Sequence, residues 1–167
     1  MTLKSKILNR DAINKKIIRL SWEIYENNIN KKELFIVGVK GRGGLLSKEL
    51  CKELNKISKI KINTGTISIN KDDPKNDKIT SDFNIKDCEN SIVILVDDVL
   101  NSGRTLMYAS SFFLHISVHK LSILVLVNRT HTRYPVKADY VGLSLATTLK
   151  EYINVVLAGD EQGVYLN

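Results

Sequence analysis

The sequence predicts an α/β fold: a mostly parallel, twisted sheet with helices on both faces, and a small hood from its C-terminal and N-terminal parts. Two observations predict it. Short apolar runs, typical of strands buried on both faces, alternate along the chain with segments of helical periodicity. Such alternation is typical of strand–helix–strand units that form parallel sheets. The 167 residues also suit one domain with a full core, so we expect 1–167 to be a single domain.

The first half of the chain predicts two helices and two strands. A helix capped by Asn9 or Asp11 runs to about Asn27, with apolar side chains at helical spacing at Ile13, Ile17, Leu20 and Ile24. A strand over 34–39, a loop over 40–44, a helix over 45–55 and a strand over 60–69 follow. The helix over 45–55 places Leu46, Leu50 and Leu54 on one face.

The second half begins with a polar segment, 70–90, whose weak periodicity predicts a mobile loop rather than a domain linker. A strand over 92–96, a helix from about Arg104 to Leu114 and a strand over 121–127 come next. The helix would turn Leu106, Ala109 and Phe113 inward. A basic loop over 128–138, short strands over 140–143 and 152–157, and an edge strand over 163–166 complete the prediction.

Composition excludes several classes of protein. The net charge of +7 fits either a nucleic-acid-binding surface or lysines spread over an ordinary surface, and their even spread along the chain favours the second interpretation. No apolar run is long enough to cross a membrane, and the start lacks a secretory core, so we expect a cytoplasmic protein. Cys51 and Cys88 are too few for a disulfide framework, and we expect both to be buried or half-buried.

The segment 92–105, IVILVDDVLNSGRT, carries the strongest chemical signal. Asp97 and Asp98 follow a buried strand and would lie at its carboxyl end, where open α/β sheets bind ligands. The polar turn over 101–105 precedes a helix, so its backbone N–H groups and the helix dipole would attract an anion. Carboxylates for sugar hydroxyls beside an anion-binding turn predict a sugar phosphate site.

Other catalytic patterns are missing from the sequence. It contains no GxxxxGK[ST] loop, no GxGxxG fingerprint, no HExxH, no paired CxxC and no GxSxG. His115, His119 and His131 are not grouped with acids as metal ligands would be, so we expect surface or loop positions for them. We therefore expect no metal held by protein ligands alone.

Three segments carry a resemblance to a known family. The VDDVLNSGRT of Val96–Thr105 resembles the phosphoribosyl pyrophosphate (PRPP) signature of type I phosphoribosyltransferases. Residues 36–50 are similar to that family's pyrophosphate loop and following helix, and residues 138–142 to its hood segment facing the base. Within the family, the chain is most similar to the pyrimidine operon attenuation proteins that are also uracil phosphoribosyltransferases. The resemblance covers nearly the whole chain and implies the type I phosphoribosyltransferase fold.

The resemblance implies a role for each part of the site. Asp97 and Asp98 would hold the ribose hydroxyls directly or through Mg²⁺, and Lys71 would close over the pyrophosphate from the mobile loop. The 5′-phosphate would be wrapped by Asn101, Ser102, Gly103, Arg104 and Thr105. The pyrophosphate would be held by Lys40, Gly41 and Arg42. The nucleobase would meet Val99, Asn128, a stacking Tyr140 and the backbone of Val141.

The implied reaction joins PRPP and a nucleobase into a nucleoside monophosphate and pyrophosphate. Purine-salvage relatives carry an acid at the position of Asn101 and a lysine at that of Asn128, so both asparagines argue against hypoxanthine or guanine and favour either a pyrimidine substrate, with uracil implied by the resemblance, or a purely regulatory role. Attenuation proteins usually have an aromatic residue where Asn101 stands. The resemblance also implies a homodimer or a higher homo-oligomer.

Two other interpretations remain open. The first is an RNA-binding regulator that senses UMP or PRPP through the same pocket, with Arg129, Arg133 and Lys137 of the basic loop as candidate RNA contacts. A solvated loop explains the same three charges. The second is a phosphoribosyltransferase that binds nucleotide without catalysis. Turnover of a nucleobase tests for the enzyme, and specific binding to pyrimidine-operon leader RNA tests for the regulator.

Overall fold

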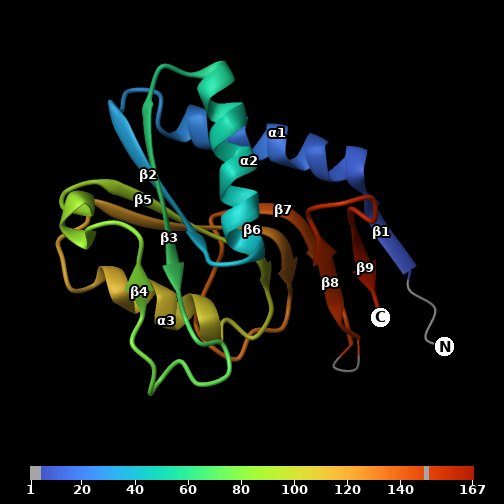
Figure 1. The fold of residues 1–167 in the computed structure, drawn as a ribbon. Coiled ribbons are helices and arrows are strands. Elements are labelled where there is room, and N and C mark those ends of the chain that lie inside the picture. The colour runs from blue at the N-terminus through green and yellow to red at the C-terminus, as the bar shows by residue number, and fades with distance from the viewer. Residues whose placement is uncertain (1–4, 149–150) are drawn as a thin grey trace.

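The computed structural model describes residues 5–148 and 151–167, and its main sheet has the predicted α/β form (Figure 1). The strands lie in the order β4-β3-β2-β5-β6-β7. Their bounds are Glu33–Val39 (β2), Lys61–Ser68 (β3), Thr80–Ser81 (β4), Ile92–Leu100 (β5), Lys120–Arg129 (β6) and Tyr140–Leu145 (β7). Neighbouring strands from β3 to β7 run parallel, and the short β4 is antiparallel to β3. The carboxyl ends of β2, β5 and β6 therefore meet at one edge.

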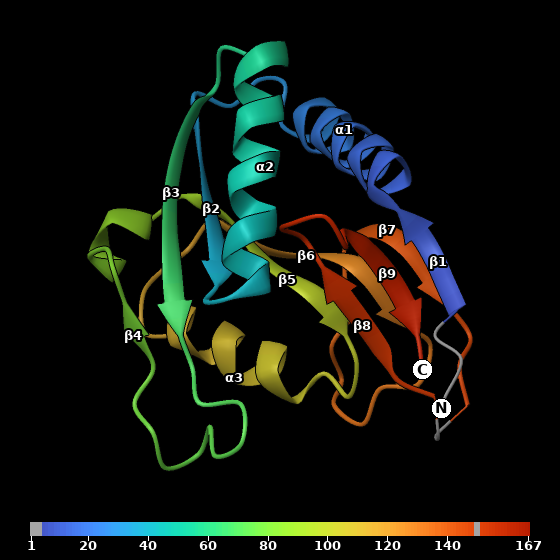
Figure 2. The ribbon, with the colours of Figure 1, turned by 45° about the vertical axis from the view of Figure 1, so that its right-hand side comes forward.

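Helices cover both faces of this sheet, as predicted (Figure 2). The helices α1 (Arg10–Asn27) and α2 (Arg42–Ile57) pack on one face, and α3 (Arg104–Phe113) packs on the other. All three predicted apolar faces are buried: Ile13, Ile17, Leu20 and Ile24 on α1; Leu46, Leu50 and Leu54 on α2; Leu106, Ala109 and Phe113 on α3. The oxygen of Asn9 accepts the Ala12 N–H at 2.9 Å, so Asn9 caps the first helix.

A second, three-stranded antiparallel sheet forms the hood, with strands β1 (Ser5–Asn9), β8 (Ile153–Val156) and β9 (Gly163–Leu166) in the order β1-β9-β8. The prediction of an edge strand over 163–166 is wrong, because β9 lies in the middle. The strand β1 was not predicted; its five residues, SKILN, show no clear alternation. Ile153, Val155 and Val164 join the core beneath α1 and α2, which fixes the hood to the main sheet.

Two predicted boundaries next to the motif are corrected. Helix α2 begins at Arg42 rather than at residue 45, because the Gly41 carbonyl already accepts the Leu45 N–H at 3.1 Å. Strand β5 continues to Leu100, so Asp97 and Asp98 lie inside the strand rather than after it. Gly43 allows the first turn of α2 to press against this strand, since a Cβ there would lie 2.6 Å from the Val96 carbonyl oxygen.

The segment 70–90, which the sequence predicts as a mobile loop, contains regular secondary structure. It contains β4 and a 3₁₀ helix, η1 (Ile85–Cys88), whose Cys88 is fully buried. The Asp82 carboxylate accepts the Thr66 N–H at 2.7 Å and the Thr66 hydroxyl at 2.8 Å, which ties β4 to β3. These hydrogen bonds hold the pKa of Asp82 below its usual value. The irregular part is the connection between β3 and β4, which carries Lys71.

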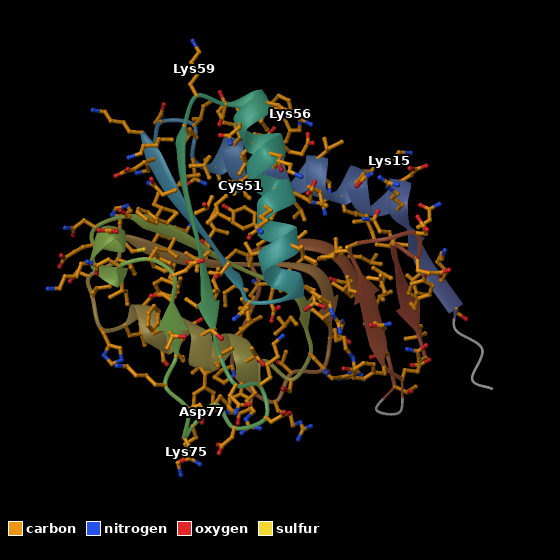
Figure 3. All side chains as sticks on the ribbon, viewed as in Figure 1. Lys15, Cys51, Lys56, Lys59, Lys75 and Asp77 are labelled. Atoms are coloured by element: carbon orange, nitrogen blue, oxygen red, sulfur yellow. The ribbon has the colours of Figure 1, made fainter. Side chains whose placement is uncertain are left out.

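The positive charge is spread over the surface, as the sequence suggested. Lys15 extends from α1, Lys56 from the last turn of α2, Lys59 from the connection between α2 and β3, and Lys75 from the β3–β4 connection (Figure 3). In the described part of the chain, no helix is both long and apolar enough to cross a membrane. Cys51 and Cys88 are buried free thiols, and burial raises the pKa of each to about 11. Both therefore stay protonated and unreactive at neutral pH.

Candidate active site

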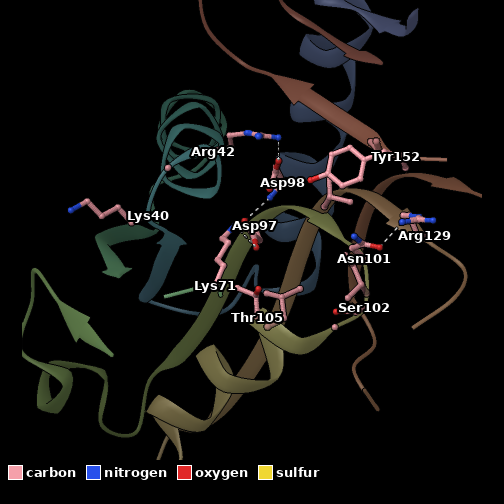
Figure 4. Close-up of a pocket in the computed structure, with 16 residues that line it drawn as sticks. Lys40, Arg42, Lys71, Asp97, Asp98, Asn101, Ser102, Thr105, Arg129 and Tyr152 are labelled. Carbon is pink, nitrogen blue, oxygen red and sulfur yellow. Dashed lines mark hydrogen bonds and ion pairs between the residues drawn. The ribbon is translucent and has the colours of Figure 1, made fainter. Parts of the chain in front are cut away.

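A pocket of about 380 Å³ opens at the carboxyl ends of β2 and β5, between the main sheet and the hood (Figure 4). Most of the predicted site residues line it: Lys40, Gly41, Arg42, Lys71, Asp97, Asp98, Val99, Asn101, Ser102, Gly103 and Thr105. Leu100, Leu106, Arg129, Tyr152 and Ile153 complete the lining. After the ligand parts expected from the sequence, we call residues 40–42, 71, 97, 98, 101–103 and 105 the phosphoribosyl half, and the opposite side, Arg129, Tyr152 and Ile153, the base half.

The floor of the phosphoribosyl half is a pair of buried carboxylates facing two cations. Asp97 and Asp98 are 2% and 6% exposed. Arg42 donates from Nη1 to Asp98 Oδ2 at 3.2 Å, and Lys71 Nζ lies 3.7 Å from Asp97 Oδ2. Lys71 and Arg42 come from the β3–β4 connection and the first turn of α2, so two separate segments supply positive charge to this floor. A ligand that carries both hydroxyls and negative charge matches this arrangement.

The two carboxylates compete for ionisation. Burial and, to a smaller extent, the adjacent Asp98 charge together raise the pKa of Asp97 to about 7, while Lys71 opposes the rise. The Asp98 N–H donates to Asp97 Oδ1 at 3.0 Å and holds that carboxylate in place. A cation or a hydroxyl donor entering the pocket would stabilise the ionised pair.

The anion-binding turn has the predicted geometry. Gly103 adopts φ +84°, a left-handed conformation that favours glycine, and Ser102 Oγ accepts the Arg104 N–H at 3.3 Å. The Ser102 carbonyl accepts the N–H groups of Arg133 and Tyr134 at 2.8 and 3.0 Å, so the loop after β6 holds the turn from behind. The remaining N–H groups at the start of α3 are free to face an anion.

The start of α2 forms a second anion-binding position. Gly41 adopts φ +100°, another left-handed conformation, and the Lys40 N–H donates to the Ile67 carbonyl at 2.8 Å. This turn connects β2 to α2 within three residues and exposes the Lys40 and Arg42 side chains. Two helix N-termini, those of α2 and α3, therefore lie on the same pocket, separated by the two carboxylates.

The base side differs from the prediction in its aromatic residue. Tyr140 is 3% exposed and packs in the core against α1, where burial raises its pKa and its hydroxyl contacts Asn28. The Val141 carbonyl accepts a hydrogen bond from Arg19 of α1 at 2.6 Å, so it is not available to a base. Neither residue lines the pocket. The stacking role expected of Tyr140 and the base-binding role expected of the Val141 backbone do not fit these positions.

Tyr152, rather than Tyr140, is the aromatic residue that lines the pocket. It precedes β8, is 58% exposed, and lines the pocket beside Ile153 (Figure 4). Sequence reasoning missed it, although an aromatic residue at the head of the apolar run 152–157 was the available signal. Val99 lines the pocket as predicted, whereas Arg104 and Asn128 lie outside its lining.

Arg129 was expected in the basic loop as an RNA contact, and the structure places it elsewhere. It is the last residue of β6 and is 9% exposed. Its guanidinium donates to Thr147 Oγ1 at 2.7 Å, to Asn101 Oδ1 at 2.5 Å and to the Thr148 carbonyl at 3.1 Å. These bonds occupy all three guanidinium nitrogens, so Arg129 is an internal anchor of the pocket.

Comparisons with known proteins agree with this geometry. The phosphoribosyl transferase domain model matches residues 4–160. Bifunctional protein PyrR of Clostridium kluyveri is 34% identical over 95% of this chain and 93% of its own length. Bifunctional protein PyrR of Staphylococcus epidermidis is 35% identical over 90% of each chain.

Solved structures share the fold. The hypoxanthine phosphoribosyltransferase of Trypanosoma cruzi superposes with a TM-score of 0.80 at 16% identity, over 97% of this chain and 95% of that chain. The hypoxanthine-guanine phosphoribosyltransferase of Bacillus anthracis gives a TM-score of 0.75 at 18% identity, over 96% and 95%. With the family match and the PyrR relatives, these findings place the chain in the type I phosphoribosyltransferase family.

Proposed function

We propose that the protein transfers the 5-phosphoribosyl group of PRPP to uracil, giving UMP and pyrophosphate. The observation that carries the proposal is the order of groups along the pocket. An anion-binding turn at Ser102–Thr105, two carboxylates and a cationic turn at Lys40–Arg42 follow one another. PRPP has the matching order: a phosphate, two hydroxyls and a diphosphate.

Each group then has one task. Asp97 and Asp98 accept hydrogen bonds from the ribose hydroxyls, and the turn before α3 binds the 5′-phosphate through backbone N–H groups. Arg42 and Lys71 move from the carboxylates to the diphosphate when it binds. The bond between the anomeric carbon and the pyrophosphate oxygen breaks as a ring nitrogen of uracil bonds to that carbon, and the ring nitrogen's proton passes to solvent. The pocket contributes by positioning the reactants and stabilising separated charge.

Magnesium fits this site as a partner of the substrate. Among the residues that the structure describes, no cluster of three or more His, Cys, Asp or Glu side chains could hold a metal ion. Asp97 and Asp98 supply two carboxylates, and Mg²⁺ commonly binds one or two carboxylates together with substrate phosphates. Bound in this way, Mg²⁺ would neutralise diphosphate charge.

Uracil is supported by two features. The PyrR relatives cover nearly the whole chain, and the resemblance drawn from the sequence links that group to uracil. Asn101 stands where purine-salvage relatives carry an acid, and an amide does not accept a proton from a purine ring nitrogen. Tyr152 adds an exposed aromatic ring against which a flat base can stack.

A nucleobase panel tests the proposal. Purified protein, Mg²⁺ and PRPP are incubated with uracil, cytosine, hypoxanthine or guanine, and nucleotide products are separated by chromatography. We expect UMP from uracil. Asp98→Asn, purified in parallel, controls for host enzymes. Nucleotide formation from a purine alone would overturn the choice of base, and no product from any base would overturn catalysis.

Regulation through RNA is a second candidate, and the exposed basic loop supports it. Arg133 and Lys137 are exposed. The backbone of their loop is hydrogen-bonded to the Ser102 carbonyl in the anion-binding turn, so a nucleotide bound at that turn can change the position of the loop. We would measure binding to pyrimidine-operon leader RNA and to a shuffled RNA of equal length, with and without UMP. Preference for the leader supports regulation. If both RNAs bind with equal affinity and both affinities fall equally as the salt concentration rises, the protein binds RNA only as any polycation does.

A further inference from the structure

Asn101 is held in one orientation by Arg129. Arg129 Nη1 donates to Asn101 Oδ1 at 2.5 Å, and its other two nitrogens are bound to Thr147 and to the Thr148 carbonyl. Arginine has donors and no acceptor, so the atom of Asn101 that faces it has to be the oxygen. The Asn101 side chain therefore cannot flip without losing a charge-assisted hydrogen bond.

This orientation leaves the amide nitrogen of Asn101 toward the ligand. Asn101 lines the pocket, and Figure 4 shows its nitrogen on the side away from Arg129, turned toward the pocket interior. The NH₂ group has two donors and no acceptor. At this position the pocket offers a base a hydrogen-bond donor of fixed direction.

We propose that Asn101, oriented by Arg129, is a specificity-determining donor that selects nucleobases presenting a lone pair toward the turn between β5 and α3. Uracil fits because its two carbonyl oxygens offer such lone pairs. A base that presents an N–H group there would leave two donors opposed, which costs binding free energy. The inference rests on the proposed function of the pocket, and it gives Asn101, which lies where the phosphoribosyl half meets Arg129 of the base half, the task of reading the base.

Arg129 links this donor to the stacking side of the base half. It joins the end of β6, the turn at Asn101 and the connection at Thr147 and Thr148, a few residues before Tyr152. One buried guanidinium thus fixes the edge donor and supports the segment leading to the aromatic ring. Arg129 is a positioning residue, because it acts through Asn101.

The test uses Asn101→Asp, which keeps nearly the same shape and still accepts from Arg129. The group facing the base changes from a donor to a carboxylate oxygen. We would titrate wild type and variant with UMP and with ribose 5-phosphate by calorimetry, and take the ratio of the two affinities. Both ligands carry the same phosphate and ribose, so the ratio reports the contribution of the base to affinity. The repulsion between the new carboxylate and the phosphate lowers both affinities alike and cancels in the ratio.

We expect Asn101→Asp to lower the ratio by about tenfold, the size of one lost hydrogen bond with a repulsive contact in its place. A ratio unchanged within about twofold would overturn the inference. If wild type binds UMP no better than ribose 5-phosphate, the base-reading role fails and the phosphoribosyl site stands. If it binds neither ligand, the proposed function fails with it.

A second pair of variants tests whether Arg129 acts through Asn101. Arg129→Met should lower the UMP to ribose 5-phosphate affinity ratio in the protein with Asn101, and should lower it less when Asn101→Ala is already present, because only the support at Thr147 and Thr148 is then left to lose. Equal loss in both backgrounds would mean that Arg129 supports the pocket only as structure. Circular dichroism of each variant ensures that folded proteins are compared.

Discussion

The two halves of the pocket are built differently. The phosphoribosyl half comes from short continuous segments: residues 40–42 after β2, residues 97–105 from β5 to α3, and Lys71 from one connection. The base half joins Arg129 of β6 to Tyr152 and Ile153 of the hood. A segment that carries its own turn and helix start shows its function in sequence order. A half assembled by packing between distant elements does not.

The halves also differ in their cost to the fold. Asp97 and Asp98 are nearly fully buried side by side, whereas Tyr152 is more than half exposed. Buried like charges destabilise the folded state, so the phosphoribosyl half is expected to cost folding free energy that the base half does not. Four substitutions test this contrast.

The largest expected effect is on stability, from Asp97→Asn. The pKa of Asp97 is raised from 3.8 to about 7, so the folded state holds a proton that the unfolded chain releases. Its stabilising contribution is complete below pH 4 and is lost as pH rises to about 7. Asp97→Asn leaves Asn101 and Arg129, the two residues proposed to read the base, unchanged.

Denaturant unfolding should therefore find Asp97→Asn more stable than wild type at pH 8 by up to roughly 4 kcal/mol, with little difference near pH 4. Asp160→Asn, which replaces an exposed carboxylate in the hood, should show no such pH-dependent gain. A constant difference between the Asp97 variant and wild type across this range would contradict the burial argument.

The next effect is on PRPP affinity, from Asp98→Asn. This change removes the charge that pairs with Arg42 at 3.2 Å and an acceptor for a ribose hydroxyl. Calorimetry with Mg²⁺ should record a loss of about tenfold to a hundredfold, the range of a charge-assisted hydrogen bond. The fold should survive, because Asn is isosteric with Asp. Unchanged PRPP affinity would remove Asp98 from the site.

Tyr152→Ala should affect only the base half, in contrast to Asp98→Asn, which affects the phosphoribosyl half. Loss of a stacking ring should weaken UMP binding by about tenfold while leaving ribose 5-phosphate affinity nearly unchanged. Tyr152→Phe, which keeps the ring, should restore UMP binding. Tyr140→Phe should leave it unaffected, because Tyr140 lies in the core. The reverse result for the two tyrosines would return the base to the position predicted from the sequence.

The smallest effect is expected from Lys71→Gln. Its ammonium is half exposed and 3.7 Å from Asp97, so PRPP affinity should fall by less than about fivefold. Since Lys71 lowers the pKa of Asp97, its removal should shift the pH dependence of PRPP binding to higher pH. Lys75→Gln, on the same connection but exposed at its tip, should change neither quantity.

Periodicity and local turn chemistry were enough to predict the fold and to single out Asp97, Asp98 and the turn over 101–105, whereas Lys71 and residues 40–42 were pointed out only by the family resemblance. Tyr140 and Tyr152 show the limit. Each stands at the head of a short apolar strand, and only the packing of α1 over β7 buries one while leaving the other open. Arg129 looked like part of a basic loop because its three partners, Asn101, Thr147 and Thr148, are distant in sequence.

The hood's central strand has a consequence for how the molecule folds. β9 pairs with β1, so Ser5 lies opposite Leu166 and Asn9 opposite Gly163. Contacts of such long sequence separation close large loops, and because the entropy of loop closure is lost before the contacts stabilise the chain, we expect them to form late. During refolding, the pocket should become able to bind phosphate before it becomes able to bind a base. A ribose phosphate could then act as an early folding aid, with recognition of the base as the last property to appear.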